Sequence, residues 1–349
     1  MASNSQVVTT DMFFDKQQVL TIAEVGLAHD GSLGAAHAYI DAAADCGVNA
    51  VKFQTHIAAE ESTAAEQFRV KVFPQDATRY DYWQRTGFEK LQWLELAGHA
   101  RQRGLMFLSS PFSNLAVDWL IDCQVPAWKV ASGELTNRPM LAKMCDTGMP
   151  LLISSGMSSW SELDETVAFV KSRGNPFGIF QCTTSYPCPP NKWGLNVLAE
   201  LANRFGCPVG LSDHSGEIYA SLAAVALGAT MLEFHIAFSK KQFGPDAKAS
   251  LTLEQTAQLV EGVKQIQTAL KGPIDKDAQA LELKGLHDLF TKSIVAAHDL
   301  SAGQSLKFAD LAFKKPGTGI SAAKAESLVG KKLKRDVSRD HFFSDADFA

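Results

Sequence analysis

Two short stretches, VGLSDHS at residues 209–215 and TMLEFHI at residues 230–236, carry the strongest indication of the fold. Each is a brief apolar run that ends in Ser, Asp, Glu or His. Placed at the carboxyl ends of successive buried strands, His214 and His235 indicate either a metal pair or an acid/base site. The plainer interpretation is that one or both are core histidines with satisfied hydrogen bonds.

The same pattern continues on both sides of these stretches. From residue 19 to about residue 270, short apolar runs alternate with longer amphipathic segments. The apolar runs are residues 19–25, 50–55, 105–110, 127–132, 151–155, 178–183, 209–212 and 231–236; the amphipathic segments are 35–44, 89–103, 115–123, 140–146, 162–171, 195–202, 219–227 and 253–270. Strands that alternate with helices predict a parallel sheet with helices outside it.

Eight such pairs over about 250 residues predict an α/β fold of the (β/α)8 TIM-barrel type. A doubly wound open sheet is the alternative. We favour the barrel because polar residues collect at the carboxyl ends of all eight runs, and a barrel brings all eight ends to one mouth. The segment 59–87, between the second run and its helix, is too long for a turn, so we expect a lid or a loop near the site.

The chain is expected to divide into a barrel and a small second domain. The barrel, a catalytic domain, takes residues 1–271, and residues 272–285, which contain Gly272, Pro273 and several charges, indicate a linker. Residues 286–349 then form the second domain. So small a unit buries little core, and we expect it to pack on a partner.

Composition excludes several classes of function. The 349 residues are 46% hydrophobic and 20% charged, as in ordinary globular proteins. A net charge of −5 offers no basic surface for nucleic acid or for an anionic membrane. No run approaches 18 apolar residues, and the first twenty residues lack the apolar core of a secretory signal, so we expect a cytoplasmic protein without a membrane span.

The six cysteines form no Cys-x-x-Cys motif, which is typical of a reduced compartment. Cys182, at the end of a predicted strand, is either a nucleophile or, in the simpler interpretation, a small buried filler.

Two lysines are expected at the barrel mouth. In VKFQT at residues 51–55, Lys52 and Gln54 share one face of the strand, and a buried ammonium requires a partner. Lys129 ends the fourth run. Hydroxyls lie at neighbouring strand ends, at Ser110 and Ser154. Lysines and hydroxyls at one mouth suit a ligand that carries both a phosphate and a carboxylate.

Carboxylates and imidazoles gather at the same predicted mouth. The two-residue spacing places Glu233 on the face of His235, and Glu24 ends the first run. Asp246 lies in the loop after the eighth run. Glu134 follows the fourth run, where it could equally begin the next helix. Imidazoles with carboxylate and water oxygens suit Mn²⁺, Zn²⁺ or Fe²⁺, and the spacing does not choose among them.

A series of motifs, in order along nearly the whole chain, resembles the sialic acid synthase family with its C-terminal antifreeze-like domain. The motifs are EVGLAHDG at 24–31, VKFQT at 51–55, KVASGELTN at 129–137, ISSGM at 153–157, QCTTSYP at 181–187, GLSDH at 210–214, EFH at 233–235, GPD at 244–246 and KPGTG at 315–319.

This resemblance implies a reaction and its participants. The family condenses phosphoenolpyruvate with an N-acetylated amino sugar, N-acetylmannosamine or a relative, to give a nine-carbon 2-keto acid and phosphate by C–O cleavage. His214 and His235 would bind Mn²⁺ or Mg²⁺, and would act in catalysis together with Glu24 and Glu134. The positions that match phosphoenolpyruvate ligands are Lys52, Ser110, Lys129, Ser132, Ser154 and Ser212; those on the sugar side are Glu24, Gln54, Thr184, Tyr186 and Asp246.

The resemblance also implies a domain-swapped homodimer, in which Phe290 and Lys315 of the small domain complete the partner's barrel mouth. Some positions depart from the family pattern, namely Ala28, Asp30, Thr184, the Lys315 that replaces an arginine, and the segment 68–83. These departures concern the choice of sugar, because a lysine does not reproduce the planar fork of an arginine.

Two alternatives remain beside the synthase. One is a metal-dependent pyruvate aldolase on the same barrel, which would need fewer anion contacts and would release no phosphate. The other is a catalytically silent sugar-binding relative, although its expected signature, the loss of a lysine or a metal histidine, is not present.

Overall fold

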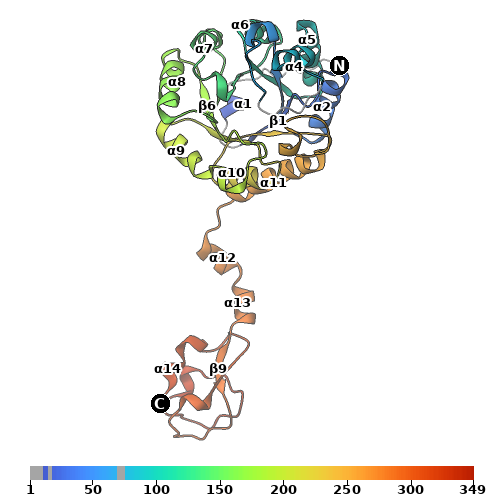
Figure 1. The fold of residues 1–349 in the computed structure, drawn as a ribbon. Coiled ribbons are helices and arrows are strands. Elements are labelled where there is room, and N and C mark those ends of the chain that lie inside the picture. The colour runs from blue at the N-terminus through green and yellow to red at the C-terminus, as the bar shows by residue number, and fades with distance from the viewer. Residues whose placement is uncertain (1–10, 15–17, 69–74) are drawn as a thin grey trace, which may run out of the picture. The chain divides into compact units, whose positions relative to one another are not determined.

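Eight parallel strands surrounded by helices form the first part of the chain (Figure 1). The computed structural model describes residues 11–14, 18–68 and 75–349, and the chain divides into two units, Met1–Lys271 and Gly272–Ala349. The strand order in the first unit is β3-β2-β1-β8-β7-β6-β5-β4, which is the order of a barrel that is nearly closed between β3 and β4. The predicted (β/α)8 barrel is therefore confirmed.

The strands are β1 Leu20–Gly26, β2 Ala50–Thr55, β3 Met106–Pro111, β4 Trp128–Val130, β5 Leu151–Ser154, β6 Phe177–Cys182, β7 Val209–Asp213 and β8 Met231–His235. The helices of the outer ring are α2 Leu33–Asp45, α5 Lys90–Gln102, α6 Asn114–Asp122, α7 Arg138–Cys145, α8 Trp160–Ser172, α9 Leu195–Phe205, α10 Tyr219–Ala226 and α11 Leu253–Lys271. No helix in the described part of the chain is both long and apolar enough to cross a bilayer.

The interior of the barrel is apolar at one level and polar at the next. Leu20, Ile22 and Met231 belong to an apolar cluster inside the barrel, and Phe13 of the short helix α1 (Asp11–Phe14) joins it. The strand residues that follow this cluster toward the carboxyl ends carry the charges. The register sets Glu24 beside Lys52 of β2 and beside His235 of β8. A larger apolar core lies between the sheet and the helix ring.

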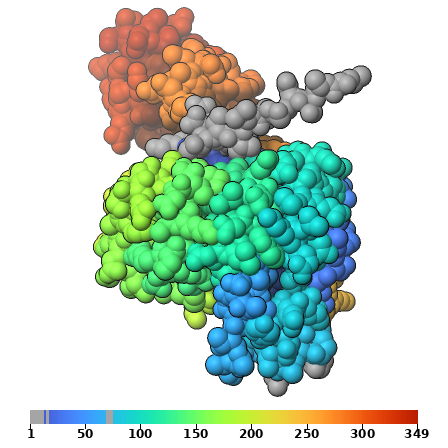
Figure 2. Space-filling model, turned by 90° about the horizontal axis from the view of Figure 1, so that it is seen from above, coloured from blue at the N-terminus to red at the C-terminus, as the bar shows by residue number. Residues whose placement is uncertain are grey.

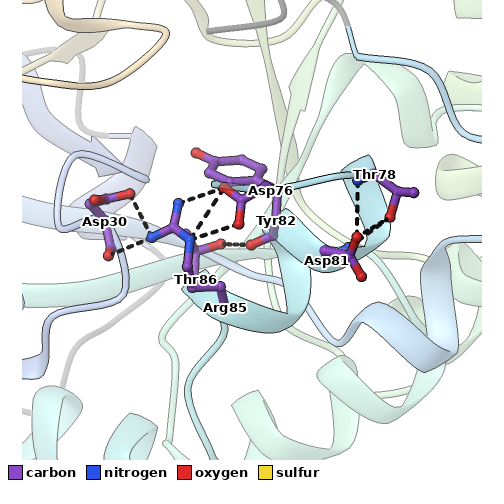
Figure 3. A network of polar contacts seen from close by, with 7 residues as sticks. All are labelled: Asp30, Asp76, Thr78, Asp81, Tyr82, Arg85 and Thr86. Carbon is purple, nitrogen blue, oxygen red and sulfur yellow. Dashed lines mark hydrogen bonds and ion pairs between the residues drawn. The ribbon is translucent and has the colours of Figure 1, made fainter. Parts of the chain in front are cut away.

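The segment 59–87, expected as a lid or a loop, instead contains two helices, α3 (Ala58–Glu61) and α4 (Arg79–Thr86). A capping box begins α4: Thr78 Oγ1 accepts from the N–H of Asp81, and the Asp81 carboxylate accepts from the N–H of Thr78 (Figure 3). The segment projects from one end of the barrel in Figure 2, where it is coloured blue to cyan. Part of the predicted segment 68–83 lies outside the described residues.

Arg85 ties α4 to the loop after β1. Its Nε and Nη2 donate to the two carboxylate oxygens of Asp76 at 2.9 Å each, and its Nη1 donates to Asp30 Oδ1 at 2.9 Å (Figure 3). Gly31 lies against the same helix, because a Cβ there would come 2.5 Å from the Arg85 carbonyl oxygen. The Asp30 that departs from the family pattern is thus part of this anchor.

The second unit has its own small core around an antiparallel pair, β9 (Ser293–Ala296) and β10 (Leu311–Lys314), with α14 (Ala325–Leu328). Two helices precede it, α12 (Lys276–Glu282) and α13 (Lys284–Phe290). Residues 272–285, expected as a linker, are therefore largely helical. Asp275 caps α12 by accepting from two backbone N–H groups, which explains why a charged segment forms a helix here.

Candidate active site

Four buried charges lie together at the carboxyl ends of the barrel strands. Lys52 Nζ is 2.7 Å from Glu24 Oε2 and 3.8 Å from Glu233 Oε1, and Lys129 Nζ is 3.3 Å from Glu233 Oε1. All four side chains are at most 5% exposed. Two cations and two anions balance each other, as buried charges must. Both lysines lie where the sequence predicted them, and Glu233 joins them as an unforeseen partner.

The cluster shifts the protonation of its members. Burial by itself would lower the pKa of Lys52, but Glu233 and Glu24 outweigh it and the pKa is raised. Burial lowers the pKa of Lys129, because Glu233 opposes it only in part and Lys52 adds to it. Burial would raise the pKa of Glu233, but Lys129 and Lys52 lower it to about 2. Lys129 is therefore the member whose charge an incoming anion would stabilise most.

Serine hydroxyls surround these charges. Lys129 Nζ donates to Ser154 Oγ at 2.5 Å, and Ser212 Oγ donates to Glu233 Oε1 at 3.1 Å. Both hydroxyls line a cavity of about 80 Å³, which the charged cluster also lines. The predicted Ser110 and Ser132 line it as well.

Ser132 is held by a backbone contact that only glycine permits. Ser132 Oγ accepts from the N–H of Gly156 at 3.1 Å. A Cβ at position 156 would lie 2.7 Å from that oxygen and 2.8 Å from Cys182 Sγ, so any side chain would push the two walls apart. The SSG turn after β5 therefore positions a hydroxyl on a different strand end.

His214 and His235 lie at the same mouth, with ring centroids 5.2 Å apart. His214 Nδ1 is 3.1 Å from the carbonyl oxygen of Thr183, which can only accept, so Nδ1 carries the hydrogen. Burial lowers the pKa of His214 to about 3, and the charge of His235 adds to this. His214 is thus neutral with its lone pair on Nε2. The Tyr186 ring packs against it, with centroids 4.2 Å apart.

The nitrogen atoms that His214 and His235 offer are of the kind that bind divalent metal ions. A neutral imidazole with a free Nε2 suits a divalent transition-metal ion, and Oε2 of the neighbouring Glu233 is buried without a hydrogen-bond partner in the described structure. Within the described residues, no three or more His, Cys, Asp or Glu side chains gather as ligands would. The pair would thus give such an ion two ligands, and oxygens from substrate or water would supply the others.

The remaining predicted barrel residues line the cavities that open above the charges. Gln54 donates to Glu24 Oε1 at 2.8 Å. Together with Tyr186, Thr184 and Asp246 it lines a cavity of about 390 Å³. Glu134, in a short 3-10 turn after β4, lines a neighbouring cavity of about 300 Å³. Burial raises the pKa of Glu134, although Asn137 donates to it and opposes this.

Phe290 and Lys315 belong to the second unit. Lys315 Nζ lies over the Phe290 ring, 4.9 Å from its centroid. Their predicted place at a barrel mouth stays a prediction.

Several residues that line the cavities were not predicted from the sequence. His56, Glu61 and Arg79 line the 300 Å³ cavity. Phe112 lines this cavity, the 390 Å³ cavity and the 80 Å³ cavity. His56 and Phe112 follow β2 and β3 directly, so the rule that found Ser110 could have found them. Arg79 had no such signal, because it lies on a helix of the inserted segment.

Cys182 lines the charged cavity, but its chemistry is that of a buried thiol. Burial raises its pKa to about 11, although Lys129 opposes this. A thiol that holds its proton at neutral pH is a poor nucleophile, which favours the filler interpretation.

The amino-acid sequence of the chain resembles two family models and several known proteins. The model of the NeuB family matches residues 39–275, and that of the SAF domain matches residues 291–349. The N,N'-diacetyllegionaminic acid synthase of Campylobacter jejuni is 34% identical over 330 residues, which cover 93% of this chain and 98% of that protein. The human N-acetylneuraminate-9-phosphate synthase is also 34% identical, over 91% of this chain and 89% of its own.

Among solved structures, the N-acetylneuraminic acid synthetase of Leptospira borgpetersenii, crystallised with citrate, is 28% identical with a TM-score of 0.69 and covers 78% of this chain and 92% of its own. The two family models together reach both units and include β2, β4 and β8, which carry Lys52, Lys129 and Glu233. The chain therefore belongs to the NeuB family, whose named members are synthases of sialic, legionaminic and pseudaminic acids, and it carries a C-terminal SAF domain.

Proposed function

We propose that this enzyme is a nonulosonic acid synthase that condenses phosphoenolpyruvate with an N-acetylated amino sugar. The observation that carries the proposal is the buried pair Lys52 and Lys129, ringed by serine hydroxyls at a barrel mouth. Phosphoenolpyruvate brings a carboxylate and a phosphate, and two ammonium groups with hydroxyl donors can hold both. A neutral ligand would not need them.

Anion binding and the protonation of Lys129 support each other. Burial lowers the pKa of Lys129 in the empty cavity, and a phosphate or carboxylate placed beside it would raise that pKa again. Lys52 keeps its charge through Glu24 and Glu233. Ser110, Ser132 and Ser154 add hydroxyl donors around the same cavity, while Ser212 donates its hydrogen to Glu233. The ligand is thus oriented before the reaction, and its charge is balanced without water.

The acceptor sugar would occupy the wider cavity above, against Gln54, Thr184, Tyr186 and Asp246. The nucleophilic carbon of phosphoenolpyruvate attacks the sugar aldehyde, water adds to the resulting cationic carbon, and phosphate leaves with its bridging oxygen as that C–O bond breaks. Glu134, whose pKa burial raises, is suited to transfer a proton during these steps.

His214 and His235 would hold a divalent ion such as Mn²⁺ or Mg²⁺, which when bound supplies Lewis-acid polarisation of the sugar aldehyde. The neutral state of His214, with Nδ1–H donated to the Thr183 carbonyl, leaves Nε2 ready for such a role.

We further propose a cytoplasmic homodimer in which each SAF domain serves the partner's barrel. Large apolar side chains of α12 and α13 are exposed, at Leu281, Leu283, Leu286, Leu289 and Phe290. So many exposed apolar groups within ten residues are typical of a contact surface. All six cysteines are unpaired, which fits a reducing compartment.

The test is phosphate release from phosphoenolpyruvate with Mn²⁺ and a panel of N-acetylated and di-N-acetylated hexoses. Release should depend on a sugar and should disappear in Lys129→Met and His214→Ala. Sugar-dependent condensation of pyruvate without phosphate release would favour an aldolase. No turnover with any sugar by a folded protein would contradict the proposal.

A further inference from the structure

A side cavity of about 300 Å³ opens next to the proposed substrate cavities, and of its lining residues only Gln54 and Glu134 have a role in the reaction proposed above. Gln54 and Phe112 line this side cavity and also line both of the proposed substrate cavities. Its other walls come from His56 after β2, from Glu134 after β4, and from Glu61, Glu66, Arg79 and Trp83 of the inserted segment. The cavity is therefore continuous with the place of the acceptor sugar and belongs to the part of the barrel that the insertion builds.

His56 is fixed in this wall through both of its ring nitrogens. Its Nδ1 lies 2.7 Å from Glu61 Oε1, and its Nε2 lies 3.2 Å from Gln54 Oε1. Because the Gln54 amide nitrogen donates to Glu24, the oxygen of that amide faces His56 and can only accept. The His56 ring therefore lies between two oxygen acceptors, one on each side.

Aromatic rings pack against both faces of the His56 ring. It stacks on Trp83 with centroids 3.8 Å apart, and on Phe112 with centroids 4.3 Å apart. His56 thus anchors one oxygen of Glu61 and one end of Gln54 at the same time, and it links the side cavity to the charged cluster through Glu24.

Glu61 is left with one unused acceptor. Its Oε1 accepts from His56, but its Oε2 is buried and has no hydrogen-bond partner in the described structure. The side chain is only 7% exposed, so water does not freely replace the missing donor. A buried carboxylate oxygen without a donor is costly, and in a native protein such an atom calls for a partner, which can be a water, an ion or a ligand.

The other carboxylate from the inserted segment in this cavity has no such capacity. Glu66 Oε1 pairs with Arg79 Nε at 3.0 Å, while Glu66 Oε2 accepts from Trp83 Nε1 at 3.0 Å and from Ser62. Glu66 therefore has a structural role in the cavity wall, and Glu61 is the carboxylate that can accept a hydrogen bond from a ligand.

We infer that the side cavity is a specificity subsite in which Glu61 Oε2 accepts a hydrogen bond from an uncharged N–H or O–H group of the acceptor sugar, such as an acetamido N–H or a ring hydroxyl. This inference rests on the proposed function. A buried site that requires a donor rejects analogues that lack one far more strongly than it rejects a change of size.

The experiment compares acceptors that differ at a single carbon. The probes are N-acetylmannosamine and analogues that carry hydroxyl, acetamido, hydrogen or fluorine at C4, and likewise at C6, with phosphate release as the readout. Wild type should lose about 10- to 100-fold in kcat/KM when the donor at one of these carbons is replaced by hydrogen or fluorine, as expected for a hydrogen bond to a charged group.

The Glu61→Gln variant separates the subsite from the rest of the enzyme. A glutamine can still accept from His56 through its oxygen, but it then presents an NH₂ group to the cavity, so the preference for a donor should fall to within about threefold. Glu60→Gln is the matched control, because Glu60 lies on the same helix and is exposed. Glu61→Asp, which keeps an acceptor but withdraws it by one methylene, should show an intermediate preference.

The outcomes distinguish this inference from the proposed function. If wild type turns over several acceptors but shows no preference for a donor at C4 or C6, or if folded Glu61→Gln keeps the wild-type preference, the subsite is wrong while the synthase stands. If wild type releases no phosphate with any acceptor, the proposed function fails and the subsite fails with it.

Discussion

At the scale of single residues, Glu233 supports both buried lysines. It is the only carboxylate within ion-pair distance of Lys129 in the described part of the chain, whereas Lys52 also has Glu24. Glu233→Gln should therefore leave Lys129 buried without a counter-charge. We expect the free energy of unfolding to fall by about 3–5 kcal/mol, measured by urea denaturation at pH 7.

A second substitution distinguishes the loss of stability caused by an unpaired charge from the loss caused by altered packing. Adding Lys129→Met to Glu233→Gln removes the stranded cation, so the double variant should regain part of the lost stability while remaining inactive. Asp118→Asn breaks the exposed pair with Lys143 and should cost less than about 1 kcal/mol. A Glu233→Gln variant as stable as Asp118→Asn would contradict this account of the cluster.

His29 makes the stability depend on pH. Its pKa is lowered from 6.5 to about 4, by burial first and by the charge of His56 second. His29 therefore takes up a proton near pH 6.5 in the unfolded chain, but only near pH 4 in the native protein. The contribution of His29 is complete above pH 6.5 and is lost as the pH falls from about 6.5 to about 4, by about 1 kcal/mol per pH unit.

The substitution His29→Asn tests this slope. The N–H of Gly31 donates to His29 Nδ1, and an asparagine oxygen can take the place of that nitrogen. Urea unfolding between pH 4.5 and 6.5 should then show a slope lower by about 1 kcal/mol per pH unit. His287→Asn, at an exposed histidine, should leave the slope unchanged. An unaltered slope in His29→Asn would mean that His29 is not the group that titrates.

At the scale of elements, the barrel could be predicted from the sequence because each strand is a short apolar run with a polar end. The run 50–55 coincides with β2, and the run 209–212 falls one residue short of β7. The inserted helices could not be predicted in this way. The residues of α4 mix aromatic and charged side chains, and the helix is held by its capping box, by Arg85 and by the aromatic side chains Tyr82 and Trp83, which pack with Leu27 and Ala58.

The anchor of α4 yields an element-scale prediction. Arg85→Lys keeps the charge but cannot form the two parallel bonds to Asp76 and the third to Asp30. Hydrogen exchange of the α4 amides should accelerate about tenfold, corresponding to about 1.4 kcal/mol of local stability, while the strands of the barrel keep their protection. Arg173→Lys, at an exposed single ion pair with Asp146, is the control. Equal exchange of α4 in the two variants would refute the role of Arg85.

At the scale of the whole molecule, the sequence could predict which residues gather and could not predict how they pair. Lys52 and Lys129 lie within short strands, His214 follows a strand and His235 ends one, and a barrel brings such positions together whatever the details of packing. The sharing of Glu233 between two lysines depends on side-chain length and register, as does the contact of His56 with Glu61. Contacts of that kind have no local signature in the chain.

The exposed apolar side chains of α12 and α13 lead to a prediction about assembly. Leu286 and Leu289 are 52% and 57% exposed. If Leu286 and Leu289 contact a second copy of the chain, light scattering of the wild type should give twice the mass of one chain. The double variant Leu286→Ser, Leu289→Ser should give the mass of a single chain. Leu91, which is 78% exposed on α5, serves as the control, because Leu91→Ser should stay dimeric. A monomeric wild type would contradict the proposed dimer.

If each SAF domain serves the partner's barrel, two inactive variants should restore activity to one another. A Lys129→Met chain has a defective barrel and an intact SAF domain, and a Lys315→Ala chain that proves inactive has the reverse. In a mixed dimer, one site then joins the intact barrel to the intact SAF domain, and the other site joins the two defects. Random reassembly makes half of the dimers mixed, so phosphate release should recover to about one quarter of the wild-type rate. If each barrel used its own SAF domain, no pairing of these chains would create an intact site, and the mixture would stay as inactive as its parts.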